Sequence, residues 1–258
     1  MTAQIQLKNK SEIEIMRRVN LVVYEVLQTL REMVAPGVTT ADLDAKANEL
    51  TKKAGATSAF LNYPASQRDV QPFPGIICAS VNEAIVHGIP STVPLKEGDI
   101  VSIDYGCVLD GFFGDSAITV PVGAVSKQAE LLLKVTEESL QDAIAQCYPG
   151  NRIGDISYAV QSKVEKHGFN VVREFVGHGI GRSMHEPPHV PNYGKPGQGR
   201  TLKEGMVLAI EPMVTVGTFE TRLLADGWTA VTKDDSLAAH FEHSIAITEK
   251  GPYVLSRP

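Results

Sequence analysis

The sequence predicts a mixed α/β (α+β) fold made of two similar halves, each with helices followed by antiparallel strands. Two internal repeats favour this fold. The turn Pro36-Gly37, with an aspartate and a glycine behind it, recurs 113 residues downstream. The segment 95–104, LKEG followed by an apolar strand, recurs 107 residues downstream and places Glu211 where Asp104 stands. Repeats in the same order indicate a duplicated supersecondary unit.

We therefore expect two pseudo-symmetric halves, about residues 11–125 and 126–250, within a single domain of residues 1–258. A central antiparallel sheet, covered by the helices, would join the halves. The length of 258 residues is ample for one large core.

Helices are predicted at the start of each half. A capping box at residues 11–14 and apolar residues at helical spacing predict a helix that ends before Pro36-Gly37. A second helix follows over about residues 40–55. In the second half, a helix over about residues 126–148 precedes the repeated Pro-Gly turn.

A loop and a strand lie between the first helices and the first repeat. Residues 62–74 are polar, contain three prolines and are predicted to form a loop. Residues 75–86 have the composition of a strand, and this strand delivers His87 into a His-Gly-Ile-Pro turn.

A β-hairpin is predicted to hold two carboxylates close together. An apolar strand ends on Asp104, Asp110-Gly111 is a turn signal, and the returning strand carries Asp115. If Asp110-Gly111 form the turn, the two acids are diagonal neighbours; if the turn lies one residue earlier, they are directly opposite. Both registers put them on one sheet face, within about 5–8 Å at Cβ. A divalent metal, or a Lys or Arg side chain, would offset their repulsion.

A second pair of acids turns this hairpin into a four-carboxylate cluster. Glu211 matches Asp104 in the repeat, and Glu242 matches Asp115 to within one or two positions. Four anions at the junction of the halves require about two divalent cations. Two metals about 3.5–4 Å apart, bridged by carboxylates, are typical of a hydrolase that generates a bridging hydroxide.

His178 is the strongest nitrogen ligand among the seven histidines, because its glycine neighbours let backbone and ligand crowd together. His87 and His185 stand beside Gly or Pro turns; they are either ordinary loop residues or hydrogen-bond donors to a substrate amide. The others are expected to be structural: His167 beside a helix-ending glycine, His189 and His240 in loops or strands, and His243 on the face opposite Glu242.

Composition excludes several classes of protein. Hydrophobic content of 43% and charged content of 21% are ordinary for a globular chain, and the net charge of −6 offers no basic stripe for nucleic acid. No apolar run approaches membrane-spanning length, and the start lacks a signal-peptide pattern. Three widely spaced cysteines form neither a disulfide framework nor a zinc knot. We expect a cytoplasmic, monomeric protein without membrane or specific nucleic-acid partners.

Five motifs, in this order, resemble a known family: IDYG (103–106), the eleven-residue step to Asp115, GHGIGRSMHEPP (177–188), AIEPM (209–213) and FEHS (241–244). They look like those of the type 1 methionine aminopeptidases over essentially the whole chain. The resemblance implies the pita-bread fold and removal of the N-terminal initiator methionine from nascent polypeptides with a small second residue. It implies the short bacterial form, because Glu242 follows Glu211 by only 31 positions, which leaves no room for the insertion of type 2 relatives.

The resemblance also implies a dinuclear metal site. Asp104 and Asp115 would hold one ion, His178 and Glu211 would hold the other, and Asp115 and Glu242 would bridge them. The cofactors would be two divalent metal ions, Co, Mn, Fe or Zn, and this ligand set does not choose among them.

The resemblance assigns the remaining residues to the substrate. His87 would contact the scissile amide, His185 would contact the carbonyl oxygen as charge develops, and Glu211 would move protons for the hydroxide. The methionine pocket would be lined by Phe73, Cys78, Met184 and Trp228.

Two features depart from the family pattern, and both touch this pocket. Met184 stands where many members have phenylalanine, and the loop of residues 62–73 is several residues longer than usual. We expect the loop to form a stiff wall of the pocket; the alternative is surface decoration packed away from the site.

Two other functions remain open at this point. One is another aminopeptidase, or an Xaa-Pro dipeptidase, of the same fold, although Xaa-Pro enzymes carry a large extra N-terminal domain. The other is a non-catalytic binding module, although such relatives lose metal ligands that are all present here. The expected partner is the N-terminal methionine of nascent peptides, with association with the ribosome left open.

Overall fold

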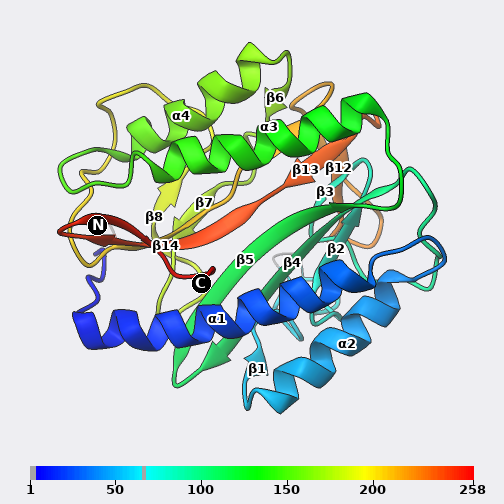
Figure 1. Cartoon of the computed structure of the whole chain (residues 1–258), viewed down its shortest axis with the longest axis horizontal. Coiled ribbons are helices and arrows are strands. Elements are labelled where there is room, and N and C mark those ends of the chain that lie inside the picture. The colour runs from blue at the N-terminus through cyan, green and yellow to red at the C-terminus, as the bar shows by residue number, and fades with distance from the viewer. Residues whose placement is uncertain (1–3, 66–67) are drawn as a thin grey trace.

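The computed structural model describes residues 4–65 and 68–258 and has the predicted α/β architecture, with helices packed on a curved antiparallel sheet (Figure 1). The described residues form four α-helices: α1 (Lys10–Met33), α2 (Thr40–Lys53), α3 (Lys127–Ile144) and α4 (Ile153–Lys166). The pair α1 and α2 packs against the strands of one half, and the pair α3 and α4 against those of the other (Figure 1). Within the described ranges, no helix has both the length and the apolar composition needed to cross a membrane.

The main sheet joins the two halves at its centre. Its strands are β1 (Thr57–Ser58), β2 (Cys78–Val81), β4 (Ile100–Leu109), β5 (Phe112–Pro121), β7 (Gly177–Gly179), β8 (Glu186–Val190), β9 (Val207–Ile210), β14 (Glu242–Thr248) and β15 (Gly251–Val254). Their order is β1-β4-β5-β14-β9-β7-β8, with β2 also paired to β4 and β15 to β14. The contact of β5 with β14 therefore brings a carboxylate strand of each half side by side.

Two small sheets accompany the main sheet, and one of them connects the halves a second time. One contains β6 (Asn170–Val171), β10 (Met213–Thr215) and β13 (Ala238–His240); the other contains β3 (Ala84–Val86), β11 (Thr221–Leu223) and β12 (Ala230–Thr232). The strand β3 belongs to the first half and pairs with β12 of the second.

Each half buries its own apolar core beneath its own helices. Val19 and Val23 of α1 pack in one cluster with Ile103 of β4, and Leu132 of α3 packs in the other with Ile245 of β14. All five side chains are at most 1% exposed. Because the helices cover one side of the sheet in each half, the polar residues of the central strands can gather on the other side.

The helix ends largely follow the sequence prediction, with one correction. The capping box of α1 is formed by Asn9 and Glu12, not by residues 11–14: the Asn9 side chain accepts the Glu12 N–H and the Glu12 carboxylate accepts the Asn9 N–H, both at 3.0 Å. An asparagine side chain caps a helix as well as a serine side chain does, and Asn9 precedes Ser11 in the chain, so the helix begins earlier than predicted. The helix α3 begins close to the predicted residue 126, with Ser126 as its N-cap, and His167 ends α4.

The central hairpin adopts the diagonal register. Asp110 and Gly111 form its two-residue turn, with φ of +53° and +74°. Positive φ at both turn residues suits the twist of the flanking strands. Gly106 stands opposite Asp115 and Ala117 opposite Asp104, so the two acids share one face.

Candidate metal centre

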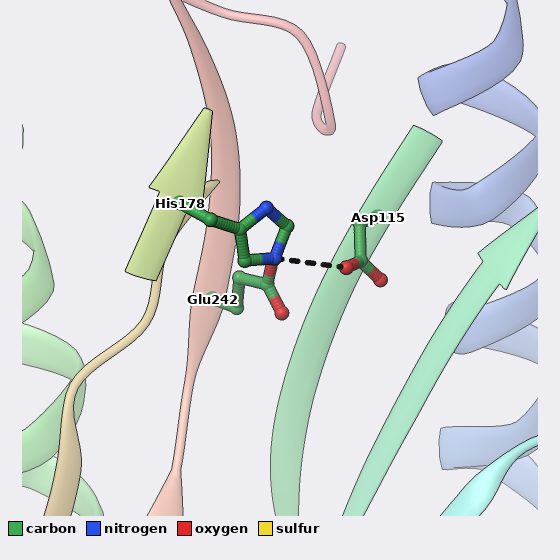
Figure 2. Close-up of side chains that lie close together, drawn as sticks. All are labelled: Asp115, His178 and Glu242. Atoms are coloured by element: carbon green, nitrogen blue, oxygen red, sulfur yellow. Dashed lines mark ion pairs between the residues drawn. The ribbon is translucent and has the colours of Figure 1, made fainter. Parts of the chain in front are cut away.

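Four carboxylates and one imidazole meet where β5 lies beside β14. We call this group the carboxylate floor: Asp104 of β4, Asp115 of β5, His178 of β7, Glu211 just after β9 and Glu242 of β14. Figure 2 shows Asp115, His178 and Glu242 pointing toward one another from three strands. Their donor atoms all lie within 4.8 Å of one another. His178 Nε2 lies 3.9 Å from Asp115 Oδ2 and 3.5 Å from Glu211 Oε1.

Reciprocal serine contacts fix the spacing of the two central strands. Ser116 donates its hydroxyl to the backbone carbonyl of Glu242, and Ser244 donates its hydroxyl to that of Asp115 at 2.8 Å. Ser116 directly follows Asp115 and contacts Glu242, whereas Ser244 lies two residues after Glu242 and contacts Asp115. The two strands are therefore held together at the residues whose side chains enter the site.

The floor is electrostatically unstable without a cation. Burial raises the pKa of Asp115 well above its ordinary value, and the neighbouring Glu242 and Asp104 charges raise it further. Burial also raises the pKa of Glu211 and Glu242. Within residues 4–65 and 68–258, no Lys or Arg forms an ion pair with these acids. The alternative expectation from the sequence, that a Lys or Arg side chain pairs with Asp104 and Asp115, is therefore wrong.

The donor atoms fit divalent metal ions. Among the described residues, Asp104 Oδ1, Asp115 Oδ1 and Glu242 Oε1 are buried without a hydrogen-bond partner. His178 donates its Nδ1–H to the carbonyl of Gly179 at 2.9 Å, which leaves the lone pair of Nε2 facing the carboxylates. Burial lowers the pKa of His178 to about 3, so its ring is neutral, as a metal ligand must be.

A cavity of about 320 Å³ opens above the floor. Its lining contains the four residues expected at a methionine pocket, Phe73, Cys78, Met184 and Trp228, and two residues of the loop expected to form its wall, Tyr63 and Pro64. The sequence did not predict the other apolar lining residues, Phe60, Val86, Phe175 and Val176. We call Tyr63, Phe73, Met184 and Trp228 the pocket wall. Phe73 and Trp228 meet edge to face with ring centroids 5.2 Å apart.

The loop of residues 62–73 lies at this cavity. Backbone hydrogen bonds close its base, from Asn62 N–H to the Phe73 carbonyl at 2.8 Å and from Phe73 N–H to the Tyr63 carbonyl at 3.0 Å. Trp228 Nε1–H donates to the carbonyl of Gln71 at 2.9 Å, which ties the loop to the turn between β11 and β12. Residues 66–67 lie outside the described residues.

His87 and His185 also face the cavity. Burial lowers the pKa of His87 to about 4, so its ring is neutral. The Tyr63 hydroxyl lies 2.8 Å from His185 Nδ1. If Tyr63 donates to Nδ1, the ring proton of His185 is on Nε2, where it can be offered to a ligand.

His240 is a site residue that sequence reasoning missed. Its Nε2 lies 3.7 Å from Glu211 Oε2 and 3.9 Å from Glu242 Oε2. Burial and, to a smaller extent, the nearby His87 lower its pKa to about 3. The available signal was its spacing, because a residue two before Glu242 shares that residue's face in an extended chain. His243 points elsewhere, with Nδ1 2.8 Å from Ser256 Oγ.

A buried ion pair anchors the turn that carries His185. Lys8 and Glu186 are 7% and 8% exposed, and their side chains form a short charged hydrogen bond. Glu186 also accepts the backbone N–H of Arg182 at 2.8 Å. The backbone of Lys8 donates to the Gly205 carbonyl at 2.7 Å. The segment before α1 thus packs against the turn between β7 and β8.

Comparison with known proteins finds relatives of the whole chain. The model of metallopeptidase family M24 matches residues 14–249. A methionine aminopeptidase of Clostridium perfringens is 49% identical over 252 residues, 98% of each chain. The crystal structure of methionine aminopeptidase from Thermotoga maritima, 44% identical, has a TM-score of 0.95 and covers 99% of this chain and 100% of that chain. A prolidase from Pyrococcus furiosus, 22% identical, shares the fold alone, with a TM-score of 0.78 over 98% of this chain and 65% of that chain.

Proposed function

Because this chain belongs to metallopeptidase family M24, we propose that its cavity is the active site of a metal-dependent aminopeptidase that removes N-terminal methionine from polypeptides. Near-identical length and 44–49% identity to methionine aminopeptidases support this activity and the pita-bread fold expected from the sequence. The observation that carries the proposal is the carboxylate floor, whose buried acids lack any cationic partner among the described residues.

Five residues would hold two divalent metal ions. Asp104 and Asp115 would bind one, His178 and Glu211 the other, and Asp115 and Glu242 would bridge them. When bound, such ions lower the pKa of water and polarise a scissile carbonyl. Their identity among Co, Mn, Fe and Zn does not follow from these donors.

The chain's own residues supply proton transfer and orientation. Glu211 would accept a proton from the attacking water and return it to the leaving amine. His87 would donate its N–H to the scissile amide, and His185 would donate to the carbonyl oxygen as negative charge develops there. Tyr63 holds the His185 ring at 2.8 Å and so fixes the direction of that donor.

Cys78 does not offer a competing nucleophile. Its thiol is buried, and burial together with the Asp104 and Asp115 charges raises the pKa of the thiol well above its ordinary value. Only a thiolate is an effective nucleophile. Cys78 therefore serves as an apolar part of the pocket.

The pocket wall would select methionine. An unbranched thioether fills a narrow apolar slot well and makes favourable contacts with aromatic edges. Phe73 and Trp228 present such edges, and Met184 adds a flexible apolar side chain. We propose cleavage before small second residues such as Gly, Ala or Ser.

The protein would act as a monomer in the cytoplasm on nascent chains. All five metal donors and the pocket wall come from one chain. The three cysteines are free and buried, which suits a reducing compartment. Contact with the ribosome would place the cavity near emerging N-termini.

The proposal is tested by peptide hydrolysis with and without metal. We expect cleavage of Met-Gly and Met-Ala peptides, no cleavage of Xaa-Pro peptides, loss of activity after chelation, and recovery when a divalent ion is restored. Full activity in a demonstrably metal-free sample would refute the two-metal site. Preference for Xaa-Pro peptides would assign the chain to the dipeptidases, and binding without hydrolysis would make it a binding module.

A further inference from the structure

His240 is the one imidazole of the site to which neither the metal ligation nor the substrate contacts proposed above give a task. Its side chain is 2% exposed, and its Nε2 is buried without a hydrogen-bond partner among the described residues. A polar atom that is buried without a hydrogen-bond partner destabilises the folded protein. We therefore expect His240 Nε2 to have a hydrogen-bond partner in the working enzyme.

The backbone of His240 is fixed by a hydroxyl network. Thr119 Oγ1 accepts the His240 N–H at 3.0 Å and donates to the His240 carbonyl at 2.7 Å. Ser102 Oγ lies 2.9 Å from the same Thr119 oxygen. The ring is therefore presented to the site from a rigid strand end.

The two oxygens of Glu211 face two different imidazoles. Oε1 lies 3.5 Å from His178 Nε2, and Oε2 lies 3.7 Å from His240 Nε2. The neutral His178 ring carries its proton on Nδ1, which donates to the carbonyl of Gly179, so its Nε2 has no proton to donate. Only His240 can then offer Glu211 an imidazole N–H.

We propose that His240 is a positioning residue: its Nε2–H donates to Oε2 of Glu211 and thereby turns Oε1 toward His178 and the metal ions. This inference rests on the proposed metal-dependent function. The present 3.7 Å separation exceeds the 2.7–3.2 Å of an N–H···O hydrogen bond, and a shift of about 0.5–1 Å closes it. Such bonds to ligand carboxylates hold metal sites in shape.

The test compares metal binding by apo-proteins of four kinds: the parent, His240→Leu, His240→Gln and His243→Gln. Leucine fills similar space without a donor, whereas the glutamine amide can offer an N–H at a similar reach. His243 lies three residues away with its ring bonded to Ser256, which makes it a matched control. Co(II) is titrated and followed by calorimetry and visible absorption.

We expect His240→Leu to weaken Co(II) binding by about 10–100-fold. His240→Gln should stay within about threefold of the parent, and His243→Gln should be unchanged. The absorption bands should keep their positions in all variants, because no ligand is lost. Without metal, His240→Leu should unfold at the parent's temperature or above, since an unpartnered polar group has been removed. Its stabilisation by Co(II) should be smaller.

Unchanged Co(II) affinity in His240→Leu would overturn the inference. Shifted Co(II) absorption bands in both His240→Leu and His240→Gln would also overturn the inference, because they would show that His240 is itself a metal ligand. If His240→Leu does not fold, His240→Asn, whose amide is too short to reach Glu211, should show the same loss. A parent that binds no Co(II) would instead refute the proposed function.

Discussion

The carboxylate floor comes from strands and strand ends of the nine-stranded sheet, whereas every residue of the pocket wall comes from a connection between strands. Tyr63 and Phe73 lie between β1 and β2, Met184 lies between β7 and β8, and Trp228 lies between β11 and β12. In the floor, backbone pairing fixes which residues meet. In the wall, side-chain contacts such as that between Phe73 and Trp228 do so. Chemistry and selectivity can therefore change independently of each other.

The largest expected effect breaks the floor. Glu211→Gln removes the proposed ligand charge and the proposed proton carrier together, and we expect kcat to fall by at least about 10³-fold. The pH–rate profile should lose one limb. The exposed Glu204 in the same segment gives the control Glu204→Gln, which should be neutral. A Glu211→Gln enzyme within tenfold of the parent would remove this residue from the mechanism.

A smaller effect is expected at the boundary between floor and wall. His87→Ala and His185→Ala should each lower kcat by about 10²–10³-fold, because each removes a donor aimed at developing charge. Bound metal, measured by elemental analysis, should stay at the parent level. The exposed His189 supplies the control His189→Ala. Loss of metal from either variant would show that the histidine is a ligand.

Changes in the wall should alter selectivity and spare the chemistry. Replacing residues 65–70 by two glycines shortens the loop while keeping the backbone pairing of Asn62 and Tyr63 with Phe73. We expect the ratio of kcat/KM for Met-Ala over Leu-Ala peptides to change by about 3–30-fold, since differences of 1–3 kcal/mol are typical of such slots. Metal dependence should not change.

A same-length replacement of residues 65–70 by glycine and serine separates loop length from loop composition. If the kcat/KM ratio for the two peptides is identical in all three proteins, the loop does not shape the pocket. The wall would then consist of Met184 and Trp228 with the loop's closed base alone.

The smallest expected effect is on the thermal stability of the metal-free protein, and it can be measured without substrate. Burial raises the pKa of Asp104 to about 7, so the stability that its protonated form gives the metal-free protein is lost as pH rises through that value. His178 and His240, whose pKa burial lowers to about 3, affect stability only below about pH 6.5. From pH 6.5 to 8, the Tm of the metal-free protein should therefore fall by several degrees.

Metal-loaded protein should show a flatter profile over the same range, because the cations keep the carboxylates ionised. Differential scanning fluorimetry of both forms in four buffers measures the slopes. Equal slopes would mean that the floor does not hold the cations.

The floor was predictable from sequence for a physical reason. Strand alternation puts Asp104 and Asp115 on one face in either register, and the repeat supplies Glu211. Only the register itself needed the structure. His240 was assigned a structural role, although its spacing of two residues from Glu242 puts both side chains on one face of an extended chain.

The wall was less predictable, because its contacts join distant segments. Tyr63 and His185 are 122 residues apart in sequence, yet they share a hydrogen bond. No local pattern encodes such a pair. Four lining residues followed from family resemblance, and Tyr63 lies in the loop that was expected to form the wall, whereas Phe60 and Phe175 emerged only from the fold.

The ion pair of Lys8 with Glu186 has a practical consequence for handling the protein. Removing one partner of a buried pair costs about 3–5 kcal/mol. A protease that nicks the segment ahead of α1, or an N-terminal tag that pulls Lys8 from its place, would strand the Glu186 carboxylate. The turn that carries His185 would become more mobile, and we expect turnover to fall although every proposed metal ligand is intact.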